Sequence, residues 1–297
     1  MHSPYLSVII PTYNRAEKLD RCLAALRSQD LATESFEVLV VDDGSSDSTP
    51  ELLKKWAGEW SSLKVLSQKN SGQGVARNKA LKQARGQVIL FIGDDIYAGK
   101  NFLKAHLQFH QDSPQLEAAA LGLTEWEEPV TPFMHWLTHG GHQFAYCKLT
   151  AHEEASFWFF YTSNISLKKD FLGARPFDPT FKAYGWEDIE LGYRLSKKNL
   201  QLMYIPEACA THDHFMEEAS LKDRMQKIGR SAVKFQKHHK DLHVLPSGLK
   251  KLTFLLIGSA PSIAGLFLLK SFIPSIFSRY YWYALMKRYF LQGIRGI

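Results

Sequence analysis

Cysteine is scarce in this chain of 297 residues. There are three, Cys22, Cys147 and Cys209, and no two of them form a C-x-x-C pair. Scattered cysteines exclude a disulfide framework and a cysteine zinc site, and they are typical of small buried side chains in a reducing compartment. Internal repeats and low-complexity tracts are also missing. We therefore expect an ordinary globular protein with a hydrophobic core, in keeping with 45% apolar residues.

The glycine-rich loops that commonly hold nucleotide phosphates are missing too. The first predicted strand, 5–10, runs into P-T-Y-N-R at 11–15 without a glycine, so it lacks the Rossmann turn. Gly72-Gln-Gly74 comes later and lacks the third glycine, and no P-loop sequence occurs. A nucleotide would have to be held in another way.

The charge balance is basic, with a formal net charge of +6 and a sequence pI of about 9.0. This balance suits nucleotide phosphates, anionic lipid or nucleic acid, and it does not choose among them. A basic helix is predicted within 222–240, but base-stacking motifs are missing, so we expect no nucleic-acid partner. A strand pattern begins almost at the first residue, so we expect no signal peptide.

Strand and helix patterns alternate along the first 125 residues. Apolar runs predict strands at 5–10, 36–41, 63–66, 88–92 and 117–123. Helical spacing predicts helices at 16–29, from 50, at 75–84 and at 101–111. This alternation predicts an α/β fold with a doubly wound, mostly parallel sheet.

Polar clusters follow three of these strands, at 11–15, 42–45 and 93–95. The carboxyl ends of parallel strands share one edge of a sheet, so these clusters predict a binding site. Gly93-Asp94-Asp95 puts two carboxylates there, and adjacent acids repel unless a cation or a donor-rich ligand accompanies them. Their oxygens suit Mg²⁺ or Mn²⁺ shared with a substrate phosphate.

Five ordered blocks carry a resemblance to a known family. They are S-V-I-I-P-T-Y-N-R, V-V-D-D-G-S-S-D, N-S-G-Q-G-V-A-R-N-K-A-L, L-F-I-G-D-D and Y-G-W-E-D-I-E-L-G-Y-R-L, within 5–243. Together they resemble the inverting family 2 glycosyltransferases of GT-A fold. The resemblance implies transfer of a sugar from a nucleotide donor, commonly a UDP-sugar, with Mn²⁺ or Mg²⁺ and inversion at the anomeric carbon.

On the nucleotide side, the resemblance implies that the turn Pro11, Thr12 and Tyr13 binds the base together with Asp43. Asp43 would accept a hydrogen bond from uracil N3–H, and Asp42 is the alternative if the register slips by one residue. It further implies that Arg77 contacts the base or the diphosphate.

Near the reacting atoms, the resemblance implies that Asp94 faces the ribose and Asp95 holds the metal. Gly93 replaces the first acid of the family's D-x-D motif, which puts the metal dependence in doubt. His212 is the preferred further metal or diphosphate ligand, and His214, two residues on in an extended segment, is the alternative.

Glu187 and Asp188 resemble the acidic pair on the acceptor side, with Asp188 as general base and Glu187 as second choice. Acids in the first turn of a helix also complement its dipole, which is the structural alternative. Asn164 would touch donor sugar or acceptor, and Trp186 or Trp158 could stack on a sugar ring. A core tryptophan is the commoner explanation.

Two regions resist this assignment. His106 and His110 are four residues apart but lack the glutamate of a zinc-protease helix, so they predict an amphipathic helix. The aromatic segment 131–146 is a candidate acceptor loop or lid.

The C-terminal segment predicts a membrane-associating helical extension. Residues 252–269 carry no charge across eighteen positions, the lower limit for a span, and Gly258, Pro261 and Gly265 interrupt them. Tryptophan and tyrosine beside lysine and arginine in 279–290 suit a membrane interface. We favour an interfacial or re-entrant segment; a true span, a packed hairpin or a dimer contact are the alternatives.

The sequence thus predicts a GT-A domain over 1–243, with a nucleotide half to about 125 and an acceptor half from 126, followed by the extension 244–297. The expected acceptor is a saccharide or a lipid-linked molecule in cell-surface assembly. The expected location is cytoplasmic, at the inner face of the cell membrane. The alternative is a non-catalytic nucleotide-sugar-binding or scaffold protein, for which Gly93 is the only support.

Overall fold

The computed structural model describes residues 4–181 and 185–296, which form two compact units. The first unit takes the described residues of Met1–Val130, Gly141–Lys182 and Glu187–His214, and the second takes those of Thr131–Gly140, Ala183–Trp186 and Phe215–Ile297. Segment 215–243, which the sequence prediction assigns to the acceptor half, falls in the second unit. The predicted boundary at residue 243 stays a prediction.

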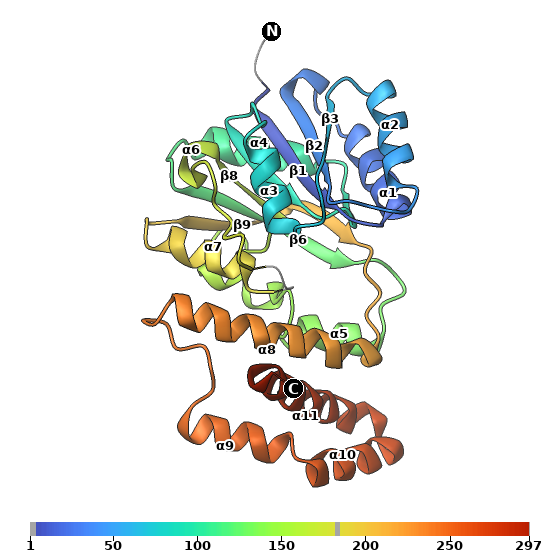
Figure 1. Ribbon diagram of the computed structural model, residues 1–297, viewed down its shortest axis with the longest axis vertical. Coiled ribbons are helices and arrows are strands. Elements are labelled where there is room, and N and C mark those ends of the chain that lie inside the picture. Colours follow the sequence, from blue (N-terminus) through green and yellow to red (C-terminus); the bar gives the residue numbers. More distant parts are fainter. Residues whose placement is uncertain (1–3, 182–184, 297) are drawn as a thin grey trace. The chain divides into compact units, whose positions relative to one another are not determined.

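A nine-stranded sheet forms the centre of the first unit, in the order β3-β2-β1-β4-β8-β6-β9-β5, with β7 beside β9 (Figure 1). Its strands are β1 (Leu6–Thr12), β2 (Phe36–Asp42), β3 (Leu63–Ser67), β4 (Val88–Ile92), β5 (Ile96–Ala98), β6 (Ala118–Trp126), β7 (Glu154–Ala155), β8 (Asn164–Lys168) and β9 (Gln201–His212). Its helices are α1 (Ala16–Arg27), α2 (Thr49–Glu59), α3 (Gln73–Leu81), α4 (Phe102–Asp112), α6 (Lys169–Leu172) and α7 (Glu187–Ser196).

The sheet has a parallel N-terminal half. β1 pairs in parallel with β2 and β4, and β2 with β3, as the alternating pattern predicts. β8 runs antiparallel between β4 and β6. The sheet is therefore mixed. The direction of β8 was not predicted, because an apolar run indicates a buried strand but carries no information about its direction.

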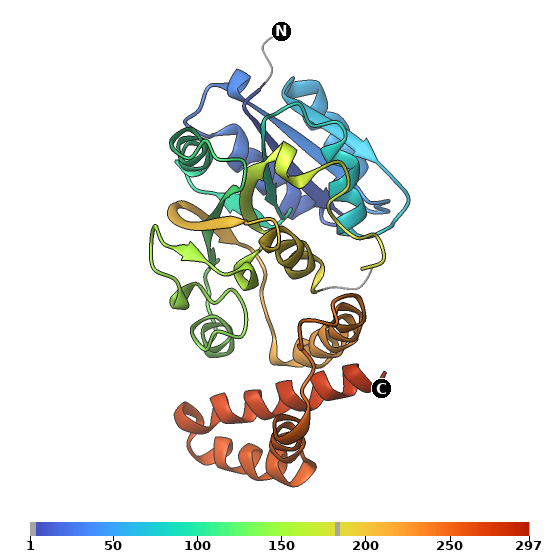
Figure 2. The ribbon, with the colours of Figure 1, turned by 90° about the vertical axis from the view of Figure 1, so that its left-hand side faces the viewer.

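Side chains alternate between two hydrophobic cores, one on each face of the sheet. Ile9 and Phe91 lie in the core covered by α3 and α7, whereas Val8 and Leu90 lie in the core covered by α1 and α4. Helices cover both faces in Figures 1 and 2. Strands buried on both faces read as continuous apolar runs, which explains why β1, β2 and β4 were visible in the sequence.

The second unit is helical. It contains α5 (Pro132–His139), α8 (Leu221–His238), α9 (Gly248–Ile257), α10 (Ala260–Phe272) and α11 (Pro274–Arg295). α8 and α11 approach closely through glycines, since a Cβ at Gly229 would lie 2.5 Å from the Phe290 carbonyl oxygen and one at Gly293 would overlap that of Gln226. Larger side chains would force these helices apart.

The apolar stretch 252–269 is broken into two helices. α9 ends before Gly258, and α10 begins after Ser259, whose hydroxyl accepts a hydrogen bond from Ser262 N. The two helices are bent by 50°. None of the described helices is long and apolar enough to cross a membrane alone, while α9 and α10 together reach that length and composition.

Candidate active site

The ends of β1, β2 and β4 come together at one edge of the sheet, as predicted. Asp43 N donates to the Thr12 carbonyl (2.9 Å), and Thr12 Oγ1 donates to Asp94 Oδ2 (2.8 Å). Thr12, Asp43 and Asp94 are all buried. Three polar clusters that are far apart in the sequence therefore form one continuous site.

Arg15 supplies the cation that the adjacent acids require. Its Nη1 lies 3.0 Å from Asp94 Oδ1 and 2.8 Å from Asp95 Oδ2. Burial raises the pKa of Asp94, with Asp95 adding to the rise, although Arg15 opposes it. Burial also favours the neutral form of Asp95, but His212 and Arg15 outweigh it and hold the pKa of Asp95 below its ordinary value. Asp95 is thus the more acidic member of the pair.

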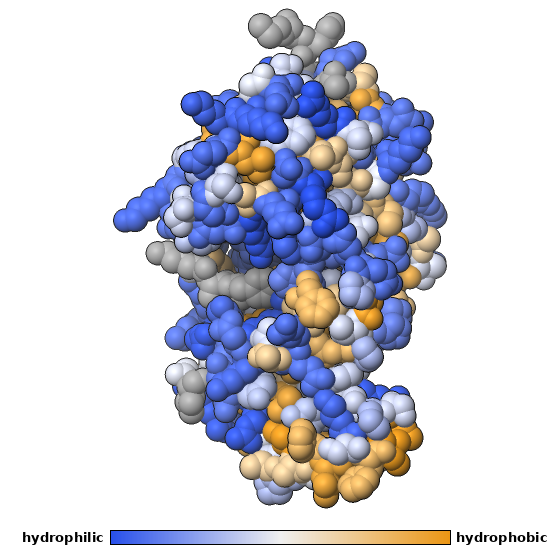
Figure 3. All heavy atoms as spheres, turned by 90° about the vertical axis from the view of Figure 1, so that its right-hand side faces the viewer, coloured by the Kyte–Doolittle hydropathy of each residue, from blue (hydrophilic) through white to orange (hydrophobic). Residues whose placement is uncertain are grey.

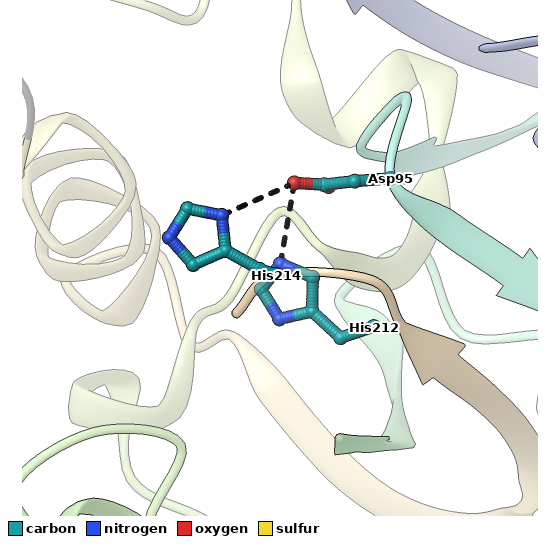
Figure 4. A group of neighbouring side chains, drawn as sticks. All are labelled: Asp95, His212 and His214. Atoms are coloured by element: carbon teal, nitrogen blue, oxygen red, sulfur yellow. Dashed lines mark ion pairs between the residues drawn. The ribbon is translucent and has the colours of Figure 1, made fainter. Parts of the chain in front are cut away.

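Two imidazoles face the same carboxylate oxygen (Figure 4). His212 Nε2 lies 3.4 Å and His214 Nδ1 lies 3.8 Å from Asp95 Oδ2, and all three potential ligand atoms lie within 4.8 Å of one another. His212 stacks on Trp126 (centroids 5.1 Å apart, 14° between planes), which fixes its ring. The donor set of one carboxylate and two imidazoles fits a divalent transition metal such as Mn²⁺ better than Mg²⁺, which prefers oxygen.

Gly93 makes room for Asp95. A Cβ at residue 93 would lie 2.7 Å from Asp95 Oδ1 and 3.3 Å from Ile96 Cγ1. A side chain at residue 93 would therefore push the Asp95 carboxylate out of its position.

Asp43 organises the loop before α3. Its Oδ1 accepts from Gln68 Nε2 (2.7 Å) and Ser71 N (2.8 Å), and its Oδ2 accepts from Gly72 N (2.8 Å). A carboxylate offers about four acceptor positions, so one remains for a base N–H. Asp42, the alternative, accepts from Ser45 N (2.9 Å). Base binding by Asp43 stays a prediction.

Arg77 lies buried on α3 with unused donors. It is 3% exposed, its Nη2 donates to Gln73 Oε1 (3.1 Å), and its guanidinium lies 5.4 Å from the centre of the Phe177 ring. Nε and Nη1 have no hydrogen-bond partner among the described residues, and Nη1 lies 3.6 Å from Asp188 Oδ1. A buried guanidinium with free N–H groups costs free energy unless an anion meets it. This geometry fits the predicted contact with a diphosphate.

Asp188, in the first turn of α7, is held by one oxygen. Its Oδ2 accepts from Thr162 N (3.0 Å) and Thr162 Oγ1 (2.7 Å). Its Oδ1 has no hydrogen-bond partner within the described part of the chain and faces Arg77 Nη1 at 3.6 Å. Glu187 instead accepts from Gln73 Nε2 (2.7 Å). One oriented carboxylate with one unoccupied oxygen is the geometry a general base needs.

Asn164 belongs to the core and does not meet the expectation that it contacts sugar. It is fully buried, and its Nδ2 donates to the carbonyl oxygens of Leu123 (3.0 Å) and Ala208 (2.8 Å). Its Oδ1 lies 2.9 Å from His106 Nε2. All its polar atoms are engaged, so the structure assigns it to joining β6, β8 and β9.

A chain of hydrogen bonds continues from Asn164. Because its Oδ1 must accept, His106 Nε2 donates, and the neutral ring then accepts at Nδ1 from Ser166 Oγ (2.8 Å). Ser166 Oγ accepts in turn from His110 Nε2 (2.9 Å), whose Nδ1 faces Lys168 Nζ at 3.5 Å. The two histidines of α4 thus lie on its buried face, as its predicted amphipathic character requires.

The remaining predicted residues differ in exposure. Pro11 is buried in β1 and Tyr13 is 46% exposed, free to meet a ligand. Trp186 belongs to the second unit, and its ring lies 4.9 Å from that of Phe235. Tyr184, which opens the last sequence block, lies outside the described residues. The sugar contacts predicted for Trp186 stay predictions.

The sequence assigned no individual role to two residues of this site. Arg15 follows the first strand in the P-T-Y-N-R block, and Gln73 opens α3. The repulsion between Asp94 and Asp95 indicated that a cation was needed but did not identify it. Only the folded chain brings Arg15 across about 80 positions to them.

Comparison with known proteins agrees with this site. The family model described as Glycosyl transferase family 2 matches residues 7–181. Validoxylamine A glucosyltransferase of Streptomyces hygroscopicus subsp. jinggangensis (strain 5008) is 34% identical over 220 residues, covering 65% of this chain and 52% of that protein. The uncharacterized glycosyltransferase YfnE of Bacillus subtilis (strain 168) is 28% identical over 243 residues, covering 65% and 61%. The chain thus spans little more than half the length of these relatives.

Two solved structures share the fold. Mannosyltransferase PcManGT from Pyrobaculum calidifontis, in complex with GDP-Man and Mn²⁺, has a TM-score of 0.66 at 17% identity over 100% of this chain and 87% of that one. S. aureus TarS 1-349, in complex with UDP, has a TM-score of 0.57 at 21% identity over 98% and 89%. These neighbours confirm the predicted GT-A fold.

Proposed function

Because the chain belongs to glycosyl transferase family 2, we propose that it is an inverting, metal-dependent enzyme that transfers a sugar from a UDP-sugar to an acceptor hydroxyl. The acceptor belongs to cell-surface polysaccharide or glycolipid assembly. One observation carries the proposal: Asp188 presents a single oxygen without a hydrogen-bond partner in the described chain, 3.6 Å from the unused Nη1 of Arg77. A base and an anion-binding group thus face one another.

In the proposed reaction, the acceptor oxygen attacks the anomeric carbon from the face opposite the nucleotide. The new carbon–oxygen bond forms as the bond to the diphosphate breaks, and the electron pair leaves with the diphosphate. Asp188 Oδ1 takes the hydroxyl proton late in this step, while Thr162 holds Oδ2. Single displacement of this kind inverts the anomeric configuration.

Charge on the departing diphosphate is the main electrostatic problem of this reaction. Arg77 supplies donors that need no reorganisation, since they are already buried and unpartnered among the described residues. Asp95, His212 and His214 would hold the metal, which neutralises phosphate charge when bound. The two imidazoles favour a transition metal over Mg²⁺ in this role, and Mn²⁺ is the one we propose.

The variant Asp188→Asn tests the assignment of the base. It keeps the size of the side chain and removes its basicity, so transfer should fall by at least about a hundredfold, the usual range for a general base. The dissociation constant for UDP with Mn²⁺ should change less than about threefold, because the base acts only in the transition state. Unchanged transfer, or loss of UDP binding in this variant, would take the base role away from Asp188.

Nucleotide choice is tested by thermal unfolding with UDP, GDP, CDP and dTDP, each with and without Mn²⁺. A ligand at a hundred times its dissociation constant stabilises by about 2.7 kcal/mol. A shift with UDP that requires Mn²⁺ supports both parts of the proposal, and a shift with another nucleotide changes the donor. Binding without turnover on any acceptor would favour the non-catalytic alternative.

We also propose that the second unit attaches the protein peripherally to the inner face of the cell membrane. Of fourteen exposed large apolar side chains in the described chain, ten lie in α9, α10 and the start of α11: Leu249, Leu252, Leu256, Phe267, Leu268, Leu269, Phe272, Ile273, Ile276 and Tyr280. Figure 3 shows the apolar surface gathered over these helices. Soluble surfaces seldom expose so large an apolar patch.

Charge supports the same proposal. Residues 215–297 carry 14 Lys and Arg against 4 Asp and Glu, a net charge of +10 within a chain of net +6. A basic, apolar surface matches anionic lipid at an interface. Flotation with vesicles of phosphatidylcholine and phosphatidylglycerol should carry the protein upward, and Leu256→Ser with Phe272→Ser should abolish this. Native protein that stays at the bottom of the gradient would refute the attachment.

A further inference from the structure

The second unit contains a pocket of its own, of about 880 Å³. It lies among residues of α5, the start of α11, the segment 215–218 and Lys270 of α10. Its volume is within the range of cavities that hold small organic ligands. The pocket is built entirely within the second unit.

Aromatic side chains form its wall. The Trp282 ring meets Phe133 edge-on (centroids 5.3 Å apart) and Trp136 at a tilt (5.5 Å). Trp282 is 5% exposed, and its indole N–H has no acceptor within the described residues. An unpaired buried donor is costly, and a ligand oxygen in the pocket would satisfy it.

The mouth of the pocket adjoins the exposed apolar surface. Phe272 (76% exposed) and Ile273 (46%) directly precede the lining residues Pro274 and Ser275 at the turn between α10 and α11. The exposed apolar surface therefore continues along the chain into the lining of the pocket. This continuity is what the entrance for a hydrocarbon chain requires.

Charge at the mouth specifies the other end of the ligand. Residues 242–297 contain seven Lys and Arg and no Asp or Glu. Among the lining cations, Lys270 pairs with Glu218 (3.0 Å), and Arg279 is exposed beside Tyr280, to whose hydroxyl it donates (3.2 Å). Glu217 also lines the pocket, and Arg279 is the lining cation that pairs with no carboxylate of the described residues.

We infer that this pocket binds a lipid that carries a phosphate headgroup, with its hydrocarbon chain among Phe133, Trp136 and Trp282 and its phosphate at Arg279. The inference rests on the proposed function, since it makes a phosphorylated lipid the carrier of the acceptor hydroxyl. It adds a defined binding site to what would otherwise be general membrane attachment.

Binding is tested with soluble probes and the full chain, so that no bilayer is needed. Calorimetry compares dodecyl phosphate below its micellar concentration with dodecyl maltoside and with inorganic phosphate. Dodecyl phosphate should bind with one-to-one stoichiometry and at least about tenfold more tightly than either, since chain burial and charge pairing both contribute. Equal affinity for inorganic phosphate would show a simple anion site, and equal affinity for the maltoside would show no role for phosphate; either result overturns the inference.

Two pairs of variants locate the site. Ser278→Trp, on the lining, fills the pocket and should weaken dodecyl phosphate by at least about tenfold, whereas Ser271→Trp, exposed on α10 outside it, should bind like the native protein. Arg279→Gln should weaken dodecyl phosphate and leave dodecyl maltoside unchanged. Lys251→Gln, an exposed cation of α9 outside the pocket, is its control.

The outcomes separate this inference from the proposed function. If a folded Ser278→Trp variant binds dodecyl phosphate as tightly as the native protein, the pocket is not the lipid site, even where vesicle flotation and sugar transfer persist. If that variant does not fold, Trp282→Phe, which keeps the ring and removes the N–H, takes its place, and unchanged affinity then overturns the inference. Failure of flotation or of transfer with intact dodecyl phosphate binding refutes only the membrane attachment or the catalysis.

Discussion

The buried histidines of α4 make the first unit sensitive to acid. His106 and His110 are 0% and 1% exposed, and burial lowers their pKa values from 6.5 to about 4 and about 3. Lys168 further opposes a positive charge on His110. The hydrogen-bond chain through Ser166 also requires both rings to be neutral, because each ring accepts at its Nδ1.

The sign of the effect follows from proton linkage. The unfolded chain binds protons at these histidines below pH 6.5, and the folded chain does so only near pH 4 and below, so stability is lost as the pH falls. Each proton changes the free energy of unfolding by about 1.4 kcal/mol per pH unit. Because the unfolded histidine is only half protonated at pH 6.5, each histidine costs about 1.6 kcal/mol between pH 6.5 and pH 5, and both cost about 3 kcal/mol.

Urea unfolding at a series of pH values measures this loss. Asp94 opposes it, since its raised pKa lets the folded state bind a proton in the same range. The contribution of Asp94 is the same in the native protein and in His106→Gln, so it cancels when the two are compared. The free energy of unfolding of the variant should change with pH with a slope smaller by about one proton. His152→Gln, which removes an exposed histidine paired with Glu207, is the matched control and should keep the native slope. A native slope in His106→Gln would refute the reasoning.

Two further predictions concern the acidic strand end. Arg15→Gln removes the cation between Asp94 and Asp95, so without metal the free energy of unfolding should fall by about 1–3 kcal/mol, given that Arg15 is part-exposed. Added Mn²⁺ should stabilise this variant more than the native protein, and equal stabilisation of both proteins in Mn²⁺ titrations would contradict the prediction. Gly93→Ala puts a Cβ against Asp95 Oδ1, so the apparent Mn²⁺ affinity measured through UDP binding should fall by about tenfold or more while the fold is retained; unchanged Mn²⁺ dependence would show that Asp95 does not hold the metal.

The parallel half of the sheet and its binding edge could be predicted because their signals are local. β1, β2 and β4 are continuous apolar runs, and each ends in residues that cannot continue a buried strand. Since such strands point the same way, the position of their polar ends follows from topology without further contacts. The same argument reached Asp95, with His212 added by the resemblance to the family.

Residues that act through long-range contacts could not be predicted in this way. Nothing in the sequence indicated that Arg15 bridges two carboxylates, or that Asn164 turns its amide into the core. A polar residue near a strand end fits both a ligand contact and a buried hydrogen-bond network. Only the partners of each polar atom decide between these readings.

Those partners separate two kinds of buried polar group in the first unit. Asn164, His106 and Ser166 are buried and fully engaged, so each donor meets an acceptor and nothing is left for a ligand. Arg77 and Asp188, on α3 and α7, instead keep Nε, Nη1 and Oδ1 without a hydrogen bond in the described chain, and Nη1 and Oδ1 face each other at 3.6 Å. Desolvation without compensation is destabilising, and a chain retains it where a substrate completes the bonds. We therefore expect Arg77 and Asp188 to contact substrate, and the satisfied network of Asn164, His106 and Ser166 to support them.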